Sequence, residues 1–461
     1  MFGMSFLGID LGTGGVRCLL ASESGEILAD ISRSLSKINL SDVAGHSEQD
    51  ANEWISILAD ALDELFANPL HRKVLAVAVD STSGTVLPVT PSGVPLAPAL
   101  LHNDGRALEE AQSCEQYFWG SCSPTFSLPK ILWMQHHLEL ADNTLFLHAT
   151  DFLNSWLVGH TDIPTDSTNA MKSGVNLETG DWLENLPSLN LPEVVSPGVV
   201  IGELSSEHCQ RWGLSTGVKL VSGATDSNAA FYASGAGEPG EWSTTIGTTL
   251  AIKGISETRI DDPTGCIYCH RHPDGHWLPG GASNAGGEIL REHSSELSVL
   301  ETASNAQTIP NDLVYPSIRR GERLPFLDAD FKPFFEGDER RGKDYLLACM
   351  EGIAFVEFLS YELLEKHGAY VGQKIFATGG AASSNLGLQI RADILQKSMH
   401  IPAHPHSAMG AAILAAAGYS NSGVGEVSKN MVSIKRVIEP STSPVEQRMD
   451  RLAYFRTRCS F

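Results

Sequence analysis

The segment LGIDLGTGGVRCLL, residues 7–20, predicts the first structural unit of this chain. A short apolar run ends at Ile9, a turn rich in glycine covers residues 12–15, and apolar residues alternate again from Val16. Two such runs joined by a short glycine-containing turn are typical of a β-hairpin. We therefore expect two antiparallel strands here, with Asp10 at the end of the first.

A second stretch, STTIGTTLAIKGI at residues 243–255, repeats the pattern of strand, Gly-Thr turn and strand. Residues 74–79 form a continuous apolar run typical of a strand that is buried on both faces. Residues 50–66 have the apolar spacing of a helix, and Asp50 with Glu53 at its start resembles a capping box. Strands that alternate with helices predict the α/β class. Because the Gly-Thr hairpin occurs twice, we also expect two related halves.

The composition excludes several classes of function. The chain has 461 residues, of which 42% are hydrophobic and 19% charged, as in ordinary globular proteins. It has 32 Lys and Arg against 55 Asp and Glu, a formal net charge of −23 at pH 7. An acidic surface repels phosphate backbones and anionic lipids, so we expect neither nucleic acid nor a membrane as a partner. No long apolar stretch or secretion signal stands out, which predicts a cytoplasmic chain.

Four motifs of small residues carry the candidate chemistry. They lie at residues 10–15, 223–228, 245–249 and 379–384. Glycine has no Cβ, so backbone amides can approach an anion such as phosphate, and the Thr13 hydroxyl adds a donor. A carboxylate at the end of a strand, as at Asp10, can hold Mg²⁺ through water. Asp226 opens a predicted helix, where it is either a cap or a base directed at a ligand. Each motif taken alone also fits an ordinary turn.

The order of these motifs resembles the FGGY-type carbohydrate kinases, which belong to the superfamily that sugar kinases share with actin. The similar stretches cover residues 8–17, 95–107, 128–134, 150–159, 223–230, 246–250, 280–287, 315–326, 350–356, 378–384 and 408–412. The resemblance implies an α/β fold with two actin-like (ribonuclease H-like) domains that flank a deep cleft. The expected boundaries are 1–225 for a sugar-binding domain, 226–425 for an ATP-binding domain and 426–461 for a C-terminal extension.

The resemblance also implies roles for single residues. Asp226 matches the catalytic base of the family, and Asp10 and Asp226 match the acidic residues that hold Mg²⁺ through water. The residues implied to bind ATP are Thr13, Gly14, Arg17, Gly247, Thr248, Gly281, Gly380, Ala381 and Ser384. The residues implied to contact the sugar are Asp10, Thr13, Ser83, Asp104, Lys172 and Asp226.

Four features of the sequence bear on the identity of the sugar within the family. Xylulose kinases of the family usually carry a Gln-Met-His-Gly run, and Ser83 stands at the position of its histidine. The Asp-x-Thr-Ser run at residues 80–83 and the Asn-Ala-x-Lys run at residues 169–172 are more similar to kinases for ribulose and related ketopentoses. His102 replaces the tryptophan of the family's Trp-Asn-Asp-x-Arg motif. The expected reaction is phosphorylation of D-ribulose to D-ribulose 5-phosphate, ahead of D-xylulose, L-ribulose and polyols such as glycerol.

The sequence leaves a second class of function open, a non-catalytic actin-like module that senses ATP and sugar. The presence of both Asp10 and Asp226 favours the enzyme, because a binding module needs no positioned base. The pair Gly14 and Gly15 replaces the serine that is more frequent in the family, which removes a hydroxyl donor from the first phosphate turn. The expected ligands are a small sugar, ATP and Mg²⁺, and a homodimer is a candidate assembly.

Overall fold

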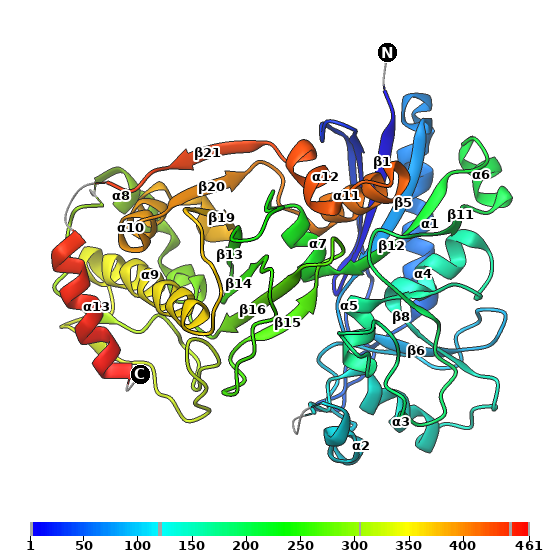
Figure 1. The fold of residues 1–461 in the computed structure, drawn as a ribbon, viewed down its shortest axis with the longest axis horizontal. Coiled ribbons are helices and arrows are strands. Elements are labelled where there is room, and N and C mark those ends of the chain that lie inside the picture. The colour runs from blue at the N-terminus through cyan, green and yellow to red at the C-terminus, as the bar shows by residue number, and fades with distance from the viewer. Residues whose placement is uncertain (1–2, 119–121, 304–305, 442–444, 460–461) are drawn as a thin grey trace. The chain divides into compact units, whose positions relative to one another are not determined.

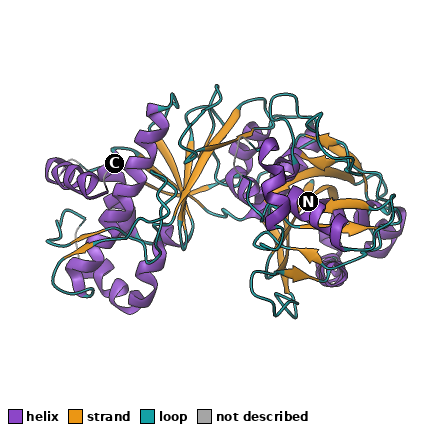
Figure 2. Cartoon of the chain, turned by 90° about the horizontal axis from the view of Figure 1, so that it is seen from below, coloured by secondary structure: helices purple, strands orange, loops and turns teal. Residues whose placement is uncertain are grey.

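The computed structural model divides the chain into two compact units (Figure 1). It describes residues 3–118, 122–303, 306–441 and 445–459. Unit 1 comprises Met1–Ala233 and His406–Met431, and unit 2 comprises Ser234–Pro405 and Val432–Phe461. In each unit, helices flank the strands (Figure 2).

Unit 1 is built on a six-stranded sheet with the order β11-β12-β5-β1-β2-β3. Its strands are β1 (Ser5–Gly12), β2 (Gly15–Ser22), β3 (Ile27–Ser34), β5 (Val74–Ser81), β11 (Val200–Glu203) and β12 (Lys219–Thr225). Strands β1 and β2 form the predicted antiparallel hairpin, whereas β1, β5 and β12 run parallel. Parallel strands present their carboxyl ends at the same edge of a sheet, where ligands of α/β proteins commonly bind.

The smaller strands of unit 1 form a second sheet with the order β4-β7-β6-β8 and a separate pair, β9 and β10. They are β4 (Glu48–Gln49), β6 (Val86–Val89), β7 (Ala99–Leu100), β8 (Leu145–His148), β9 (Thr165–Asp166) and β10 (Val194–Val195). The helices of unit 1 are α1 (Ala51–Ala67), α2 (Leu108–Cys114), α3 (Ser127–His137), α4 (Ala149–Val158), α5 (Ser167–Ala170), α6 (Ser206–Trp212), α7 (Asp226–Tyr232), α11 (Ser407–Ser420) and α12 (Val424–Met431).

Helix α1 confirms the helix that the apolar spacing predicts, but the predicted capping box does not form. The carboxylate of Asp50 caps the helix by accepting the amide N–H of Asn52 at 2.9 Å. The carboxylate of Glu53 accepts the amide N–H of Ser36 at 2.6 Å instead of turning back to the cap. The second half of the box is therefore wrong, because a partner outside the helix takes the glutamate.

Helix α11 packs on the main sheet of unit 1 with backbone against backbone. It contacts β1, β5, β12 and α7. A Cβ on Gly8 would lie 1.8 Å from the carbonyl oxygen of Ala408, and a Cβ on Gly410 would lie 1.8 Å from that of Ala229. The small residues of α11 thus allow a helix from late in the sequence to complete the unit that begins the chain. For this reason the compact units differ from the expected boundaries at 225 and 425.

Unit 2 repeats the sheet of unit 1. Its seven-stranded sheet has the order β15-β16-β14-β13-β19-β20-β21. The strands are β13 (Trp242–Ile246), β14 (Leu250–Gly254), β15 (Tyr268–Arg271), β16 (Trp277–Ser283), β19 (Lys374–Thr378), β20 (Ser398–Pro402) and β21 (Ile434–Ile438). The run β16-β14-β13-β19-β20 has the same strand directions as β3-β2-β1-β5-β12. This equivalence confirms the two related halves that the Gly-Thr hairpins predict.

The rest of unit 2 comprises a short strand pair and long helices. These elements are β17 (Leu313–Val314), β18 (Phe335–Glu336), α8 (Ser294–Ala303), α9 (Gly342–Lys366), α10 (Asn385–Leu395) and α13 (Val445–Cys459). Strand β21 pairs antiparallel with β20, and Leu452 and Phe455 of α13 belong to the core of unit 2. The residues expected as an extension, 426–461, are therefore shared between the two units. Among the described residues, no helix combines the length and apolar character that a bilayer crossing requires.

Candidate functional site

Three aspartates meet at the carboxyl edge of the main sheet of unit 1. Asp10 on β1 lies in register with Asp80 on β5. On β12, Ala224 lies in register with the same Asp80, and Asp226 follows Ala224 by two residues. Asp80 is fully buried, and neither of its carboxylate oxygens has a hydrogen-bond partner among the described residues. Burial, followed by the Asp10 carboxylate, raises the pKa of Asp80 well above its ordinary range, and Asp226 adds to this shift.

A close backbone contact fixes the position of Asp226. Strand β12 has an irregularity between Val221 and Ala224, and a Cβ on Gly223 would lie 1.6 Å from the carbonyl oxygen of Val79. Only glycine allows this approach. Asp226 then begins helix α7, is half-buried, and accepts the amide N–H of Ser227 at 2.6 Å. The predicted base is thus the first helical residue after a parallel strand.

The glycine turn between β1 and β2 lies beside this edge. The Ser407 hydroxyl, at the start of α11, donates to Oδ2 of Asp10 at 2.7 Å, a contact that joins residues 397 positions apart. Gln49 donates to the carbonyl oxygen of Thr13 at 2.8 Å. Gly14 is exposed at the tip of the turn. The predicted phosphate turn is therefore held from its flanks, with its tip in solvent.

Arg17, which was expected to bind ATP, has a partner within the sheet. It lies opposite Asp10 in the hairpin, and its guanidinium binds the carboxylate of Asp30 through two contacts of 2.8 and 2.5 Å. A paired guanidinium is oriented by its neighbour, so Arg17 reaches a phosphate only if this pair opens or is shared.

Two loops of the expected sugar site are joined by a buried lysine that the sequence does not single out. The ammonium of Lys130 donates to the carbonyl oxygens of Gly84 and, at 2.7 Å, of Leu101. Gly84 follows Ser83, and Leu101 precedes His102. Lys130 is fully buried, and burial lowers its pKa to about 7. This side chain therefore holds the loops that carry Ser83 and His102 against each other.

Asp104 also has a structural partner in place of an open site. It is fully buried, and it accepts the amide N–H of Ser47 at 2.7 Å. The guanidinium of Arg106 donates to both of its oxygens at 2.8–3.0 Å, and Arg106 also binds Glu48 at 2.8 Å. The carboxylate that was expected to contact the sugar thus anchors Arg106 in the structure.

Lys172 is a cation close enough to Asp226 for their charges to interact. It lies on the short 3₁₀ turn Met171–Ser173, and its Nζ is 5.8 Å from the ring centroid of Phe126. Burial lowers the pKa of Lys172, and the charge of Asp226 opposes this shift. Its Nζ also lies 3.5 Å from the position that a Cβ on Gly84 would take. Lys172, Asp226 and the loop of Ser83 are therefore brought together in the structure.

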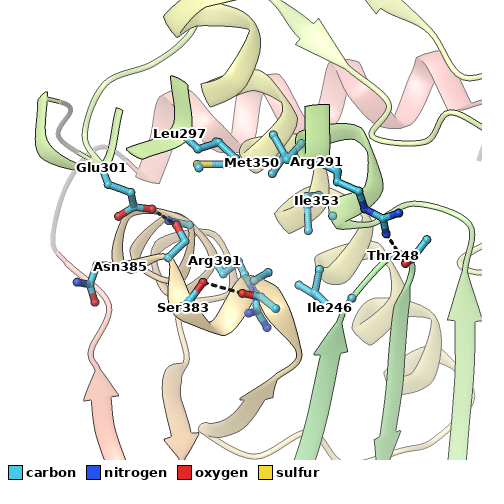
Figure 3. Close-up of a pocket in the computed structure, with 17 residues that line it drawn as sticks. Ile246, Thr248, Arg291, Leu297, Glu301, Met350, Ile353, Ser383, Asn385 and Arg391 are labelled. Atoms are coloured by element: carbon cyan, nitrogen blue, oxygen red, sulfur yellow. Dashed lines mark hydrogen bonds between the residues drawn. The ribbon is translucent and has the colours of Figure 1, made fainter. Parts of the chain in front are cut away.

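A separate cavity of about 820 Å³ lies within unit 2 (Figure 3). Its lining comes from the β13–β14 turn, the segment around Gly287, helix α9 and the turn between β19 and α10. The lining residues are Ile246, Gly247, Thr248, Gly287, Leu290, Arg291, Leu297, Glu301, Met350, Ile353, Gly380, Ala381, Ser383, Ser384, Asn385, Gly387 and Arg391. Five residues expected to bind ATP belong to this set: Gly247, Thr248, Gly380, Ala381 and Ser384.

Gly281 lies outside this cavity lining. It pairs with Ile252 inside the sheet, and a Cβ there would lie 2.9 Å from the carbonyl oxygen of Cys266. The motif at residues 280–287 reaches the cavity through Gly287 instead. The strand that contains Gly281 ends at Ser283, and Gly287, four residues beyond that end, belongs to the lining.

The cavity combines apolar and polar walls, as Figure 3 shows. The apolar side chains are Ile246, Leu290, Leu297, Met350 and Ile353. On the polar side, Arg291 donates to the Thr248 hydroxyl at 2.9 Å, and the Ser384 hydroxyl donates to Glu301. A ligand with a flat apolar part and a polar or anionic end fits such a lining. Arg291 and Glu301 were not predicted, because only folding brings them to the motifs.

Three glycines of the predicted phosphate and adenosine motifs have no structural reason to be glycine. A Cβ on Gly14, Gly247 or Gly380 would meet no atom of the described residues within 4 Å, and none has a left-handed φ. Neither packing nor backbone conformation therefore excludes a side chain there. The close approach of a ligand to the backbone is the remaining physical reason for glycine.

The stability of the folded chain tests the buried state of Lys130. Its folded pKa is about 7 against an ordinary value of 10.5. Between these values the unfolded chain binds more protons, so the free energy of unfolding rises with pH over this range. Lys130→Met removes this rise. Relative to the variant, we expect the natural chain to gain on the order of 3 kcal/mol between about pH 7 and about pH 9.5 in urea unfolding.

The charged groups that face this ammonium, Asp104, Arg106 and Lys172, are the same in both proteins. Subtraction of the two pH series therefore isolates Lys130. A difference that stays constant across the series contradicts the lowered pKa.

Comparisons with known proteins agree with this geometry. The model of the FGGY family of carbohydrate kinases, N-terminal domain, matches residues 5–232, and that of the C-terminal domain matches residues 243–419. A xylulose kinase of Staphylococcus epidermidis is 26% identical over 438 residues, 89% of this chain and 87% of that protein. A gluconokinase of Bacillus subtilis is 25% identical over 446 residues, 88% of this chain and 86% of that protein.

A solved structure described as a "xyloylose kinase" from Brucella ovis has the same fold. The TM-score is 0.87 at 22% identity, with 98% of each chain covered. The two family models together span both units and all four motifs that carry the candidate chemistry. The resemblance that the motif order indicates is thereby confirmed: the chain belongs to the FGGY family of carbohydrate kinases, and it is a sugar phosphotransferase.

Proposed function

We propose that this kinase transfers the γ-phosphoryl group of ATP to the primary hydroxyl of a ketopentose, with D-ribulose as the substrate and D-ribulose 5-phosphate as the product. One observation carries the proposal: the half-buried carboxylate of Asp226 lies beside Lys172 and an acidic sheet edge, next to loops that can hold a sugar. A carboxylate held between the end of a parallel strand and the start of a helix can act as the general base that removes the proton of an alcohol.

In this proposal, Asp226 accepts the proton of the primary hydroxyl while the hydroxyl oxygen attacks the γ-phosphorus. The new O–P bond forms as the bond from the γ-phosphorus to the oxygen that bridges to the β-phosphate breaks, and ADP leaves with that oxygen. An alcohol is almost fully protonated at neutral pH, so a positioned base contributes about 10²–10⁴-fold to the rate.

The rest of the machinery holds the nucleotide. The open backbone at Gly14, with the Thr13 hydroxyl, and that at Gly247, with Thr248, offer donors to phosphate oxygens. The apolar side of the unit 2 cavity suits an adenine ring, and the Gly380 turn suits the adenosine. Charge stabilisation and alignment dominate phosphoryl transfer, and these groups would supply both.

The acidic edge fits a Mg²⁺ ion that is bound together with the nucleotide. In the part of the chain that the structure describes, no group of three or more His, Cys, Asp or Glu side chains could hold a metal ion. Mg²⁺ in kinases is commonly held by one or two carboxylates, phosphates and water. Asp10 and Asp226 would hold it, and when bound it would neutralise charge on the phosphates.

The residues of unit 1 favour a ketopentose through Ser83, but they also support a second substrate. A half-buried serine leaves more room than the histidine of the Gln-Met-His-Gly run. The buried ammonium of Lys172 would also pair with a carboxylate, which a sugar acid such as D-gluconate carries. Because relatives named xylulose kinase and gluconokinase are similar to this chain to nearly the same degree, D-gluconate is the second candidate.

A panel of sugars separates these substrates. We expect ADP release from ATP to be highest with D-ribulose, lower with D-xylulose, L-ribulose and D-gluconate, and lowest with glycerol or without sugar. The measurement is a coupled ADP assay at matched sugar concentrations. A higher kcat/KM with D-gluconate makes the sugar acid the substrate, and ADP release that no sugar stimulates contradicts the kinase proposal in full.

The base is tested by Asp226→Asn, which keeps the shape of the side chain and removes its charge. We expect turnover to fall by about 10²–10⁴-fold while the sugar still binds, because the hydroxyl keeps its proton. Binding is measured by calorimetry and turnover by ADP release. Turnover of Asp226→Asn within a few-fold of the natural chain contradicts the assignment.

The open glycines are tested by Gly247→Ala and Gly380→Ala. A Cβ at either position meets nothing in the chain, so we expect unchanged melting temperatures. It would meet the nucleotide, so the KM for ATP should rise about tenfold or more. Gly410→Ala is the matched contrast: its Cβ overlaps the carbonyl of Ala229 and should cost about 1–3 kcal/mol of stability. An unchanged KM in both variants contradicts the nucleotide site.

A further inference from the structure

A continuous chain of buried hydrogen bonds joins the ends of β5 and β12 through the segment 165–170. Every member is buried, and the members come from β5, α4, β9, α5 and β12. The network comprises Ser81, Thr150, Asn169, Asp166, Thr168 and Thr225. Its two ends are next in sequence to Asp80 and Asp226. Nothing in the reaction described above uses this network directly.

Thr168 is the central member of the network. Its hydroxyl donates to Oδ1 of Asp166 at 2.5 Å and accepts the amide N–H of Thr225 at 2.8 Å. Thr225 immediately precedes Asp226 and is the N-cap of α7. A buried backbone N–H needs an acceptor. The threonine hydroxyl supplies that acceptor and so fixes the backbone from which Asp226 projects.

Asp166 holds Thr168 in the orientation that this contact requires. Besides the hydroxyl, its Oδ1 accepts the amide N–H groups of Thr168 and Asn169, both at 2.9 Å. Its Oδ2 accepts the side-chain amide of Asn169 at 2.7 Å. With its proton committed to Asp166, the Thr168 oxygen presents its lone pairs to Thr225. These four contacts restrain Asp166 and Thr168 to one arrangement, while Oδ1 of Asn169 has no partner among the described residues.

The other end of the network fixes β5. The Asn169 side chain also donates to the Thr150 hydroxyl at 3.2 Å, and that hydroxyl is 2.6 Å from the hydroxyl of Ser81. Ser81 directly follows Asp80. The strand end that carries Asp80 and the helix start that carries Asp226 are therefore tied to one segment.

The same segment continues to Lys172. Residues Met171–Ser173 form its 3₁₀ turn, and the Ser173 hydroxyl is 2.9 Å from Nε2 of His148. Gly174 then ends the turn with a φ of 98°, a left-handed conformation that favours glycine. The segment 165–173 thus connects both to the backbone that precedes the candidate base and to the turn that carries Lys172.

We propose that Thr168 is a positioning residue for phosphoryl transfer: through Asp166 and the Thr225 amide, it holds Asp226 at the distance and angle at which its carboxylate takes the proton of the sugar hydroxyl. This inference rests on the proposed function, because it requires Asp226 to be the base. Small displacements of a catalytic group cost much of the rate, and binding of the substrates depends less on them.

Thr168→Val tests the proposal, because valine keeps the shape of threonine and lacks its hydroxyl. With ATP and the sugar that gives the highest turnover in the panel, we expect kcat to fall about 10- to 100-fold with little change in the KM for ATP. Thr168→Ser, which keeps the hydroxyl, should restore most of kcat. Thr144→Val is the matched control, since Thr144 is buried and its hydroxyl has no partner among the described residues.

A double variant distinguishes positioning from a general loss of structure. If Thr168 acts through Asp226, Thr168→Val lowers the residual rate of Asp226→Asn no further. Hydrogen exchange of the Thr225 amide, followed by mass spectrometry, should become faster in Thr168→Val and not in Thr144→Val. Thr168→Ala replaces Thr168→Val in all measurements if the valine variant does not fold.

The outcomes separate the two proposals. Loss of turnover in Asp226→Asn with unchanged kcat in Thr168→Val overturns the inference and leaves the base in place. Additive losses in the double variant, or a loss that serine does not restore, also overturn it. Full turnover in Asp226→Asn overturns the base assignment itself, and the role given to Thr168 fails with it.

Discussion

The parallel arrangement of β1, β5 and β12 brings three carboxylates to one edge of a sheet, and the rest of unit 1 accommodates this constraint. Like charges in a poorly solvated place repel each other, so such a cluster costs stability and is typical of functional sites. Asp80 is fully buried and favours its proton-bearing form. Asp10 accepts the Ser407 hydroxyl, and Asp226 lies beside the Lys172 ammonium. Each aspartate thus has a different environment.

Each unit has its own main sheet, and the two sheets have equivalent strand orders and directions. The units differ in what surrounds the sheet. In both, the turn after the first strand of the hairpin contains Gly-Thr and lies at the carboxyl end of that strand. Unit 1 has acidic and cationic side chains at this edge. Unit 2 has a cavity with apolar and polar walls, which α9 and α10 line in part. Sheets of the same strand order therefore carry charged groups at one edge in unit 1 and lie beside a cavity in unit 2.

Short-range patterns in the sequence predicted the parts of the molecule that depend on neighbouring residues. The two hairpins, helix α1 and the order of the small-residue motifs follow from local spacing, and the motif order identified the family. The capping box failed because Glu53 binds Ser36, which lies outside the helix. Gly281, which the resemblance implies at the nucleotide, lies within β16 and outside the lining of the unit 2 cavity.

The residues that sequence reasoning missed act across long separations. Ser407 reaches Asp10, Lys130 joins two loops, and Thr168 binds the amide of Thr225. Lys130 lies in the family-like stretch at residues 128–134, but the spacing of none of the three residues indicates its partner, because the contacts form only when α11, α3 and α5 pack in the fold. The split of the last residues between the two units has the same cause, since α11 fits against Gly8 only through its small side chains.

The central claim is that Asp226 removes the proton from the sugar hydroxyl. A crystal structure of the chain with ADP and D-ribulose, or with the sugar that the natural chain turns over fastest, tests it most directly. If Asp226 is the base, we expect one of its carboxylate oxygens to lie about 2.6–3.2 Å from the primary hydroxyl of the sugar. A hydroxyl bound to another group, with the Asp226 carboxylate beyond the reach of a hydrogen bond or of one bridging water, would contradict it.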